Sequence, residues 1–179
     1  MRPCSILIFA MACGCTGINE HRTTGTFIED FSIERKVAKF IKNDSALKDQ
    51  THVNATSYNE VLLLTGQVPT EKLRQIIIDS AGRVSKVKKI HDFLTIAAPS
   101  SMISRTNDSY LTTKVKTHIL ASVIFKKEKN IKVDRIKVVT ENSVVFLLGV
   151  VSKKQANIAS QIARKTPGVQ KVVRLWELL

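Results

Sequence analysis

The residue types that usually carry catalysis are few in this chain, and they stand far apart. The four histidines lack the close spacing of a metal site; they are His21, His52, His91 and His118. No glycine-rich loop opens a helix in the form that cradles phosphates, and no serine or cysteine forms a nucleophile set with a histidine and an acid. The sequence therefore predicts no catalytic residue, no metal site, no cofactor and no small-molecule substrate.

A cysteine thiol near the N-terminus is the group for which the sequence most clearly indicates a chemical role, namely covalent modification. All three cysteines lie within the first fifteen residues, where Arg2 precedes a short apolar run that ends in small residues. This order is typical of a secretory signal, and the run is too short to span a bilayer. Residues 1–14 resemble a bacterial lipoprotein signal, so we expect Cys15 to be acylated, with Cys13 as the alternative.

The rest of the chain contains two copies of one module. Residues 15–29 lack apolar periodicity and predict a flexible tether. Residues 30–96 and 108–179 then show the same order of helix, hairpin, helix and strand, and a Pro/Ser-containing linker at 97–107 separates them. Domains of about 70 residues are marginal alone, so we expect the two copies to pack on each other.

Each first helix carries apolar residues four positions apart, which predicts one buried face. These residues are Ile33, Val37 and Ile41 in the first copy and Leu111, Val115 and Ile119 in the second. An aspartate before each run, Asp30 or Asp108, is expected to cap the helix. Polar turns between β-rich runs predict the hairpins, and Gly66 is expected to leave the sheet. The repeated Ile-Lys-Val before Ile136 either lengthens a strand or forms a bulge.

The net charge of +13 is divided unevenly between the copies. Residues 30–96 hold eleven Lys and Arg against eight Asp and Glu, a net charge of +3, whereas residues 108–179 hold fourteen against five, a net charge of +9. A strongly basic domain attracts polyanions, either nucleic acid or an anionic membrane. A merely solvated lysine-rich surface is the alternative, and the asymmetry between the copies argues against it.

The element order, the glycine that ends each second strand, and the run Gly168-Val169-Gln170-Lys171-Val172 resemble the BON domain. Two such domains behind a lipoprotein signal are similar to the dual-BON outer-membrane lipoproteins of Gram-negative bacteria. The resemblance implies an α+β fold of two tandem domains, each α-β-β-α-β with a three-stranded mixed sheet packed by two helices. It also implies a lipid-anchored place on the periplasmic face of the outer membrane, binding of anionic phospholipid by the second domain, and support of envelope integrity near division sites.

The first helix of the second domain is the expected lipid-binding element. The resemblance implies contacts from Tyr110, Leu111, Thr113, Lys114, Lys116, Thr117 and Leu120. An aromatic ring with a polar tip and a lysine one turn later suit a layer of lipid headgroups. The first copy has a serine at the equivalent of Tyr110, so the aromatic belongs to the basic copy. The alternative is that Tyr110 packs against the first domain as an ordinary interface residue.

The sequence thus favours a non-catalytic protein that binds an anionic phospholipid membrane, with an envelope protein as the partner of its first domain. A soluble periplasmic stress protein that acts through protein contacts is the runner-up. Nucleic acid is not expected as a partner, because aromatic residues are sparse on the strands and the chain carries an export signal.

Overall fold

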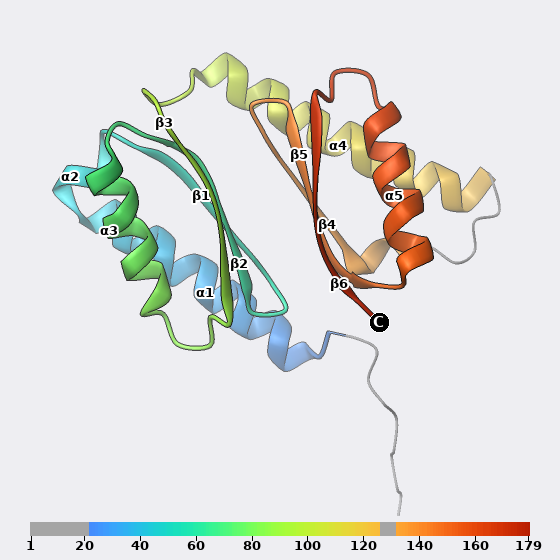
Figure 1. Cartoon of the computed structure of the whole chain (residues 1–179), viewed down its shortest axis with the longest axis horizontal. Coiled ribbons are helices and arrows are strands. Elements are labelled where there is room, and N and C mark those ends of the chain that lie inside the picture. The colour runs from blue at the N-terminus through green and yellow to red at the C-terminus, as the bar shows by residue number, and fades with distance from the viewer. Residues whose placement is uncertain (1–21, 126–131) are drawn as a thin grey trace, which may run out of the picture.

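The computed structural model describes residues 22–125 and 132–179, which form two similar halves (Figure 1). The first half contains α1 (Thr24–Asn43), α2 (Ser45–Lys48), β1 (His52–Tyr58), β2 (Val61–Val68), α3 (Glu71–Gly82) and β3 (Lys89–Ile96). The second half contains α4 (Met102–Phe125), the 3-10 helix η1 (Val133–Arg135), β4 (Ile136–Glu141), β5 (Val144–Val151), α5 (Lys153–Lys165) and β6 (Lys171–Leu178). The predicted signal, Cys13, Cys15 and the first part of the predicted tether lie outside the described residues.

Each half has a three-stranded sheet with its second strand in the middle, in the orders β1-β2-β3 and β4-β5-β6. The first two strands of each sheet are antiparallel, and the last two are parallel. A parallel pair needs a crossover connection, which α3 and α5 provide. The predicted α+β fold with a three-stranded mixed sheet in each domain is confirmed.

The two sheets face each other, and the helices lie on their outer sides (Figure 1). The middle strands are buried on both faces, so their apolar residues serve two cores in alternation. In β2, Leu62 and Leu64 enter the core of the first domain, while Leu63 joins a cluster with Phe146 and Leu148 of β5. The prediction that the two copies pack on each other is confirmed.

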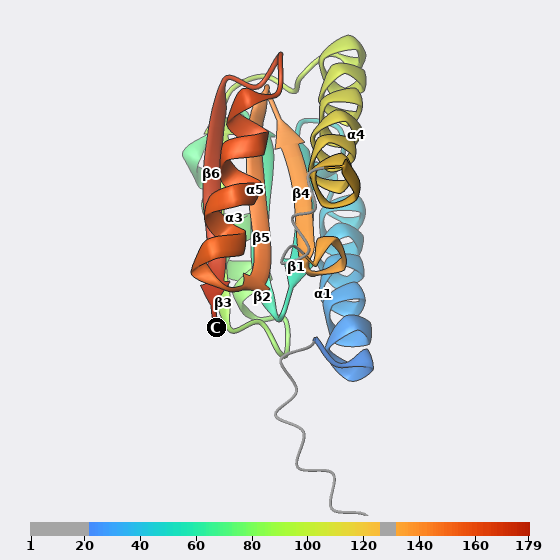
Figure 2. The same ribbon diagram turned by 90° about the vertical axis from the view of Figure 1, so that its right-hand side faces the viewer.

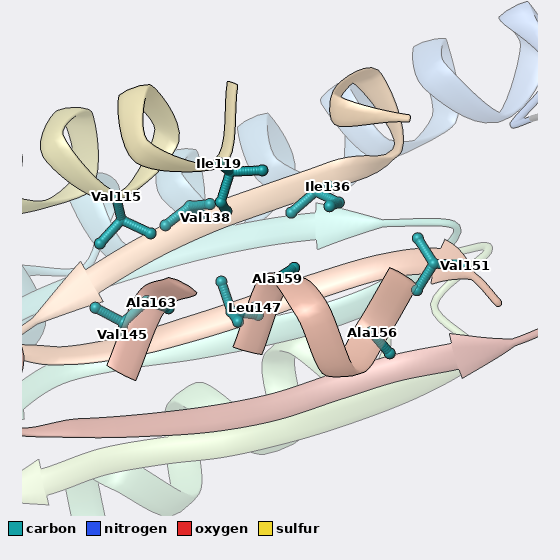
Figure 3. Close-up of a cluster of buried hydrophobic side chains, with 10 residues drawn as sticks. All are labelled: Val115, Ile119, Ile136, Val138, Val145, Leu147, Val151, Ala156, Ala159 and Ala163. Carbon is teal, nitrogen blue, oxygen red and sulfur yellow. The ribbon is translucent and has the colours of Figure 1, made fainter. Parts of the chain in front are cut away.

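The core of the second domain shows why α4 lies where it does (Figure 3). Val115 and Ile119 of α4 meet Val138 of β4, Leu147 of β5 and Ala159 of α5 in one buried cluster. Both α4 residues are at most 1% exposed, and the inward face predicted from apolar spacing is confirmed. The opposite face of α4 therefore points away from the sheet.

Both hairpins turn on two residues in the left-handed region. Asn59 and Glu60 have φ values of 55° and 65°, and the equivalent Asn142 and Ser143 have values of 49° and 60°. Positive φ at both central residues is the mark of a type I′ turn, whose twist matches that of the flanking strands. The equivalence of the two turns reflects the duplication.

The prediction that Asp30 and Asp108 cap helices is wrong, because both lie inside a helix, six residues after its first residue. Asp30 instead accepts hydrogen bonds from the amides of Asn59 and Glu60 at 2.9 and 2.8 Å. Asp108 accepts from the amide of Asn142 at 2.8 Å and from that of the next residue at 2.9 Å. Each aspartate thus ties the first helix of its domain to the hairpin turn.

Three further expectations about local structure differ from the fold. The helices α1 and α4 begin at Thr24 and Met102, inside the segments predicted as tether and linker. Gly66 does not leave the sheet, since β2 continues to Val68, and a side chain at Gly66 would collide with the backbone carbonyl of His52. The repeated Ile-Lys-Val segment ends in η1, so over its described residues it neither lengthens β4 nor forms a bulge.

Contacts between the domains are both apolar and polar. The hydroxyl of Tyr58, which is 5% exposed, donates to the backbone carbonyl of Arg135 at 3.0 Å. The side chains of Asn54 and Gln67 donate to the buried carboxylate of Glu141 at 3.1 and 2.8 Å. These bonds join β1 and β2 of the first domain to the second domain and set the mutual orientation of the two helix pairs. None of the helices within 22–125 and 132–179 has the length and apolar character needed to cross a bilayer.

Candidate membrane-contacting surface

The outward face of α4 carries a row of neutral side chains that no neighbouring element covers. Residues at spacings of three and four make up this α4 stripe: Thr106, Tyr110, Thr113, Thr117, Leu120 and Ile124. Tyr110 is 62% exposed, Leu120 is 47% exposed and Ile124 is 60% exposed. Large apolar groups at this level of exposure, aligned along one helix, are typical of an interaction surface.

The three threonines of the α4 stripe are less polar than their residue type suggests. The hydroxyl of Thr106 donates to the carbonyl of Met102 at 2.9 Å, that of Thr113 to Ser109 at 3.1 Å, and that of Thr117 to Thr113 at 3.0 Å. Because the hydroxyls bond to the preceding turn of the helix, they need no water or headgroup as a partner. The stripe therefore presents chiefly methyl groups, a phenol ring and two aliphatic side chains.

Two lysines lie beside the α4 stripe, and they differ in how free they are. Lys116 is exposed, whereas Lys114 is half-buried and donates from its ammonium to the carbonyl of Pro167 at 3.1 Å. The Lys114 ammonium also lies 5.7 Å from the centre of the Tyr110 ring, within the range of a cation–π contact. Lys114 thus fixes the Tyr110 ring and the turn after α5, while Lys116 keeps its charge available to a ligand.

The structure brings six of the seven predicted lipid-contact residues to this side of α4. Tyr110, Thr113, Thr117 and Leu120 lie on the stripe, and the two lysines flank it. Leu111 is the exception: it is 3% exposed, its Cδ1 lies next to Gly168, and it packs inward as its apolar spacing predicted. Leu111 is therefore corrected to a core residue that positions the helix, because a side chain buried in the domain has no surface to offer.

Three exposed apolar residues of α4 were missed by sequence reasoning. Ile124 is 60% exposed and extends the stripe by one turn, while Met102 and Ile103 are 73% and 83% exposed at the start of the helix. The spacing of four residues from Leu120 to Ile124 was the available signal. The alternative in which Tyr110 packs against the first domain finds no support, because most of its side chain is exposed.

A hollow between the two sheets is a second candidate site, and unlike the α4 stripe it is lined by charged side chains. Its volume is about 360 Å³, and its lining includes Lys89, His91, Arg174, Trp176 and Glu177. Burial, aided by the charge of Lys89, lowers the pKa of His91 below its ordinary value. The lining mixes cations, an acid and apolar surface, without a nucleophile set beside a base.

The other groups considered for chemistry have structural partners. His118 Nδ1 lies 3.0 Å from the hydroxyl of Thr166, which joins α4 to the end of α5. Within the described parts of the chain, no three His, Cys, Asp or Glu side chains gather in a way that could hold a metal ion. The absence of catalysis stays a prediction, and the comparisons below indicate no catalytic family.

Comparison with known proteins agrees with this architecture. Residues 29–98 and 107–177 each match the family model of the BON domain. The chain is 38% identical over 158 residues to the outer membrane lipoprotein DolP of Haemophilus influenzae, covering 88% of this chain and 79% of that protein. It is 32% identical over 154 residues to a 21 kDa hemolysin of Actinobacillus pleuropneumoniae, covering 86% of this chain and 76% of that protein.

A solved structure, the C-terminal domain of the type III secretion protein CdsD of Chlamydia trachomatis, is 12% identical and aligns with 81% of this chain and 96% of its own. Its TM-score is 0.28, which is too low to show a shared fold. The family is shown instead by the two BON-domain matches and by the 38% identity to DolP over most of both chains. The chain belongs to the BON domain family, as a dual-BON lipoprotein anchored in the outer membrane.

Proposed function

We propose that this lipoprotein binds anionic phospholipid without catalysis, through the α4 stripe of its second domain, and thereby supports the integrity of the outer membrane. The observation that carries the proposal is the α4 stripe itself: exposed Tyr110, Leu120 and Ile124 on a face free of charge, with lysines at its margins. An apolar ridge between cations is the pattern of a helix that lies in the interface plane of a bilayer.

The magnitudes favour shallow and reversible contact. Full burial of a large aliphatic side chain contributes roughly 1.5–3 kcal/mol, so half-exposed Leu120 contributes about 1 kcal/mol and Ile124 slightly more. Each lysine near an anionic surface contributes about 1 kcal/mol. The stem of Lys116 can lie along the stripe while its ammonium group reaches a phosphate. These terms are small beside a covalent anchor, so we infer that Cys15 keeps the protein at the membrane and α4 sets its orientation there.

The finer parts of the proposal rest on the family resemblance. We place the second domain against the periplasmic leaflet of the outer membrane and propose a role near division sites. An envelope protein remains our proposed partner of the first domain. The soluble periplasmic alternative is not retained, because the likeness to an outer membrane lipoprotein covers most of the chain.

Vesicle partitioning tests the proposal. The chain from Thr16 onward keeps both domains but has no acyl chain, so its sedimentation with phosphatidylglycerol vesicles reports protein surface alone. We expect Leu120→Ser to weaken partitioning about fivefold and Tyr110→Ala to weaken it further. The matched control is Leu178→Ser, which alters an equally exposed side chain, 55% against 47%, at the far end of β6 (Figure 2).

The outcome distinguishes binding by a specific surface from nonspecific binding through any exposed apolar side chain. The α4 stripe is not the lipid contact if partitioning is unchanged in both α4 variants. The same conclusion follows if Leu178→Ser reduces partitioning as much as the α4 variants do. Phosphatidylcholine vesicles provide the charge control, and on them we expect weaker binding of the unaltered chain because Lys116 loses its anionic partner.

A further inference from the structure

The first helix of the first domain also exposes large apolar side chains. Phe27 is 59% exposed, Ile28 is 63% exposed and Phe31 is 54% exposed, all within the first half of α1. The opposite face of this helix holds the core residues Ile33 and Val37, which are at most 1% exposed. The exposed residues therefore take no part in the core of their own domain, and the fold alone does not explain them.

Cations continue the same face toward the end of α1. Ile28, Phe31, Arg35, Lys39 and Lys42 follow one another at spacings of three and four, and we call this row the α1 stripe. These residues line a shallow surface hollow of about 660 Å³ whose lining has four cations and no carboxylate. The guanidinium of Arg35 lies 5.5 Å from the centre of the Phe31 ring, which joins the apolar and cationic parts.

Two acidic residues of α1, Asp30 and Glu34, lie off this face and have partners in the fold. Asp30 holds the hairpin turn, as described above. Glu34 accepts a hydrogen bond from the amide of Ser57 at 2.9 Å and lies 3.7 Å from the ammonium of Lys137 in the second domain. No carboxylate lines the hollow over the α1 stripe, and Asp44 lines only the neighbouring hollow that Lys39 shares, so the potential over the α1 stripe is positive.

The α1 stripe and the α4 stripe belong to helices on the same side of the molecule. Figure 2 shows α1 and α4 together at one side of the two sheets, with β3 and β6 at the other. The contact between Glu34 and Lys137 and the bond from Tyr58 to Arg135 hold the two domains in this arrangement. One flat surface can therefore meet both helices at once.

We infer that the α1 stripe is a second phospholipid-contacting surface, so that the protein rests on the anionic bilayer with the first helix of each domain. The occupant is a membrane because the apolar end and the cationic end together match acyl boundary and phosphate layer. The chain leading to the helix supports this choice. Eight residues lie between the predicted acylation site Cys15 and Thr24, and the nine Cα–Cα steps from one to the other span at most about 30 Å, so an anchored chain keeps α1 near the lipid.

The two stripes divide the chemistry between them. Positions equivalent to Arg35, Lys39 and Lys42 are Thr113, Thr117 and Leu120 in α4, so the first domain supplies charge where the second supplies apolar surface. The larger net charge of the second domain does not predict this, because it sums all faces of the domain. The inference rests on the lipid anchor and extends the proposed function to a separate surface.

Site-directed spin labelling of the acylated lipoprotein in phosphatidylglycerol vesicles tests the inference. With Cys15 acylated and the signal removed, an introduced cysteine is the one thiol left in the chain. We place it at Ser32 beside the α1 stripe, at Thr113 on the α4 stripe, and, as the control, at Leu178 in β6, the strand on the opposite side of the sheets from both helices (Figure 2). Accessibility to oxygen against a water-soluble nickel reagent reports whether each label lies in lipid or in water.

We expect labels at Ser32 and Thr113 to enter the lipid interface and the label at Leu178 to stay in water. A label in water at Ser32 with a label in lipid at Thr113 would overturn this inference and leave the proposed function intact. Labels in water at both helices would overturn both. A label in lipid at Ser32 alone would support the α1 surface and refute the α4 surface. Spin–spin broadening at Ser32 without vesicles would show that a second copy occupies the face instead.

A charge variant tests the cause of the contact. In the Ser32→Cys background, Lys39→Gln with Lys42→Gln is expected to lower the ratio of immersed to exposed label roughly 30-fold. The matched control is Lys72→Gln with Arg83→Gln, which removes the same charge from exposed positions on and beside α3. An equal loss in both pairs would refute a specific role of the α1 stripe.

Discussion

The hairpin-turn aspartates provide the sharpest test of how the fold positions these helices. Asp30 is 1% exposed and accepts three hydrogen bonds, from the hydroxyl of Ser57 at 2.6 Å and from the amides of Asn59 and Glu60 at 2.9 and 2.8 Å. Asp108 accepts two, both from backbone amides at 2.8 and 2.9 Å. The two copies thus give an internal comparison of the same device.

The cost of removing each carboxylate follows from its bonds. Hydrogen bonds to a charged group contribute about 1.5–3 kcal/mol each, and part of this is offset because the buried charge no longer needs desolvation. We expect Asp108→Ala to lower the free energy of unfolding by about 2–4 kcal/mol. Asp30→Ala should cost about 3–5 kcal/mol, because a third bond and the ion pair with Arg22 at 2.9 Å are lost as well.

Urea unfolding followed by circular dichroism measures the global effect, and amide hydrogen exchange at the turn measures the local one. The control is Asp79→Ala on the exposed face of α3, for which we expect a change of less than about 0.5 kcal/mol. The reasoning is refuted if Asp30→Ala costs less than about 1 kcal/mol, or if exchange at Asn59 and Glu60 does not accelerate.

Three further outcomes follow from single contacts. Gly66→Ala should lower the free energy of unfolding by more than about 3 kcal/mol, since φ is 121° and the added methyl meets a carbonyl of β1. The control Gly82→Ala on α3 should be neutral or stabilising, and equal shifts of the melting temperature in the two variants would contradict this. Tyr58→Phe should cost about 1 kcal/mol in urea unfolding by leaving the Arg135 carbonyl without its hydroxyl donor, and no cost would contradict the interdomain bond. Burial lowers the pKa of His91, so the unfolded chain takes up the proton first as pH falls below about 6.5, and the free energy of unfolding declines until the folded-state pKa is passed. His91→Gln should flatten that decline, and an unchanged dependence of stability on pH would refute the lowered pKa of His91.

The parts of this fold that depend on local pattern could be predicted from the sequence. Apolar spacing identified the buried faces of α1 and α4, and the matching hairpins revealed the duplication that the two family matches confirm. The early helix starts at Thr24 and Met102 could not be predicted in this way. The first residues of each helix include no core residues at regular spacing, so apolar periodicity cannot indicate where the helix begins.

Tertiary contacts explain the remaining errors. An aspartate just before an apolar run has the sequence pattern of a cap, but Asp30 and Asp108 find better donors in the hairpin turns than at a helix end. The threonine hydroxyls of α4 bond to the preceding turn, which turns a polar-looking row into an apolar one. Leu111 was assigned both to the core and to the lipid surface, and burial decides for the core.

The orientation of the anchored protein on its membrane tests the central claim most directly. We would record amide signal loss across the folded chain on phosphatidylglycerol nanodiscs that carry a paramagnetic lipid, with diamagnetic nanodiscs as the reference. We expect strong loss along the outward face of α4, centred between Tyr110 and Ile124, and near-complete retention along β6. Loss of equal size on β6, or no loss on α4, would contradict it.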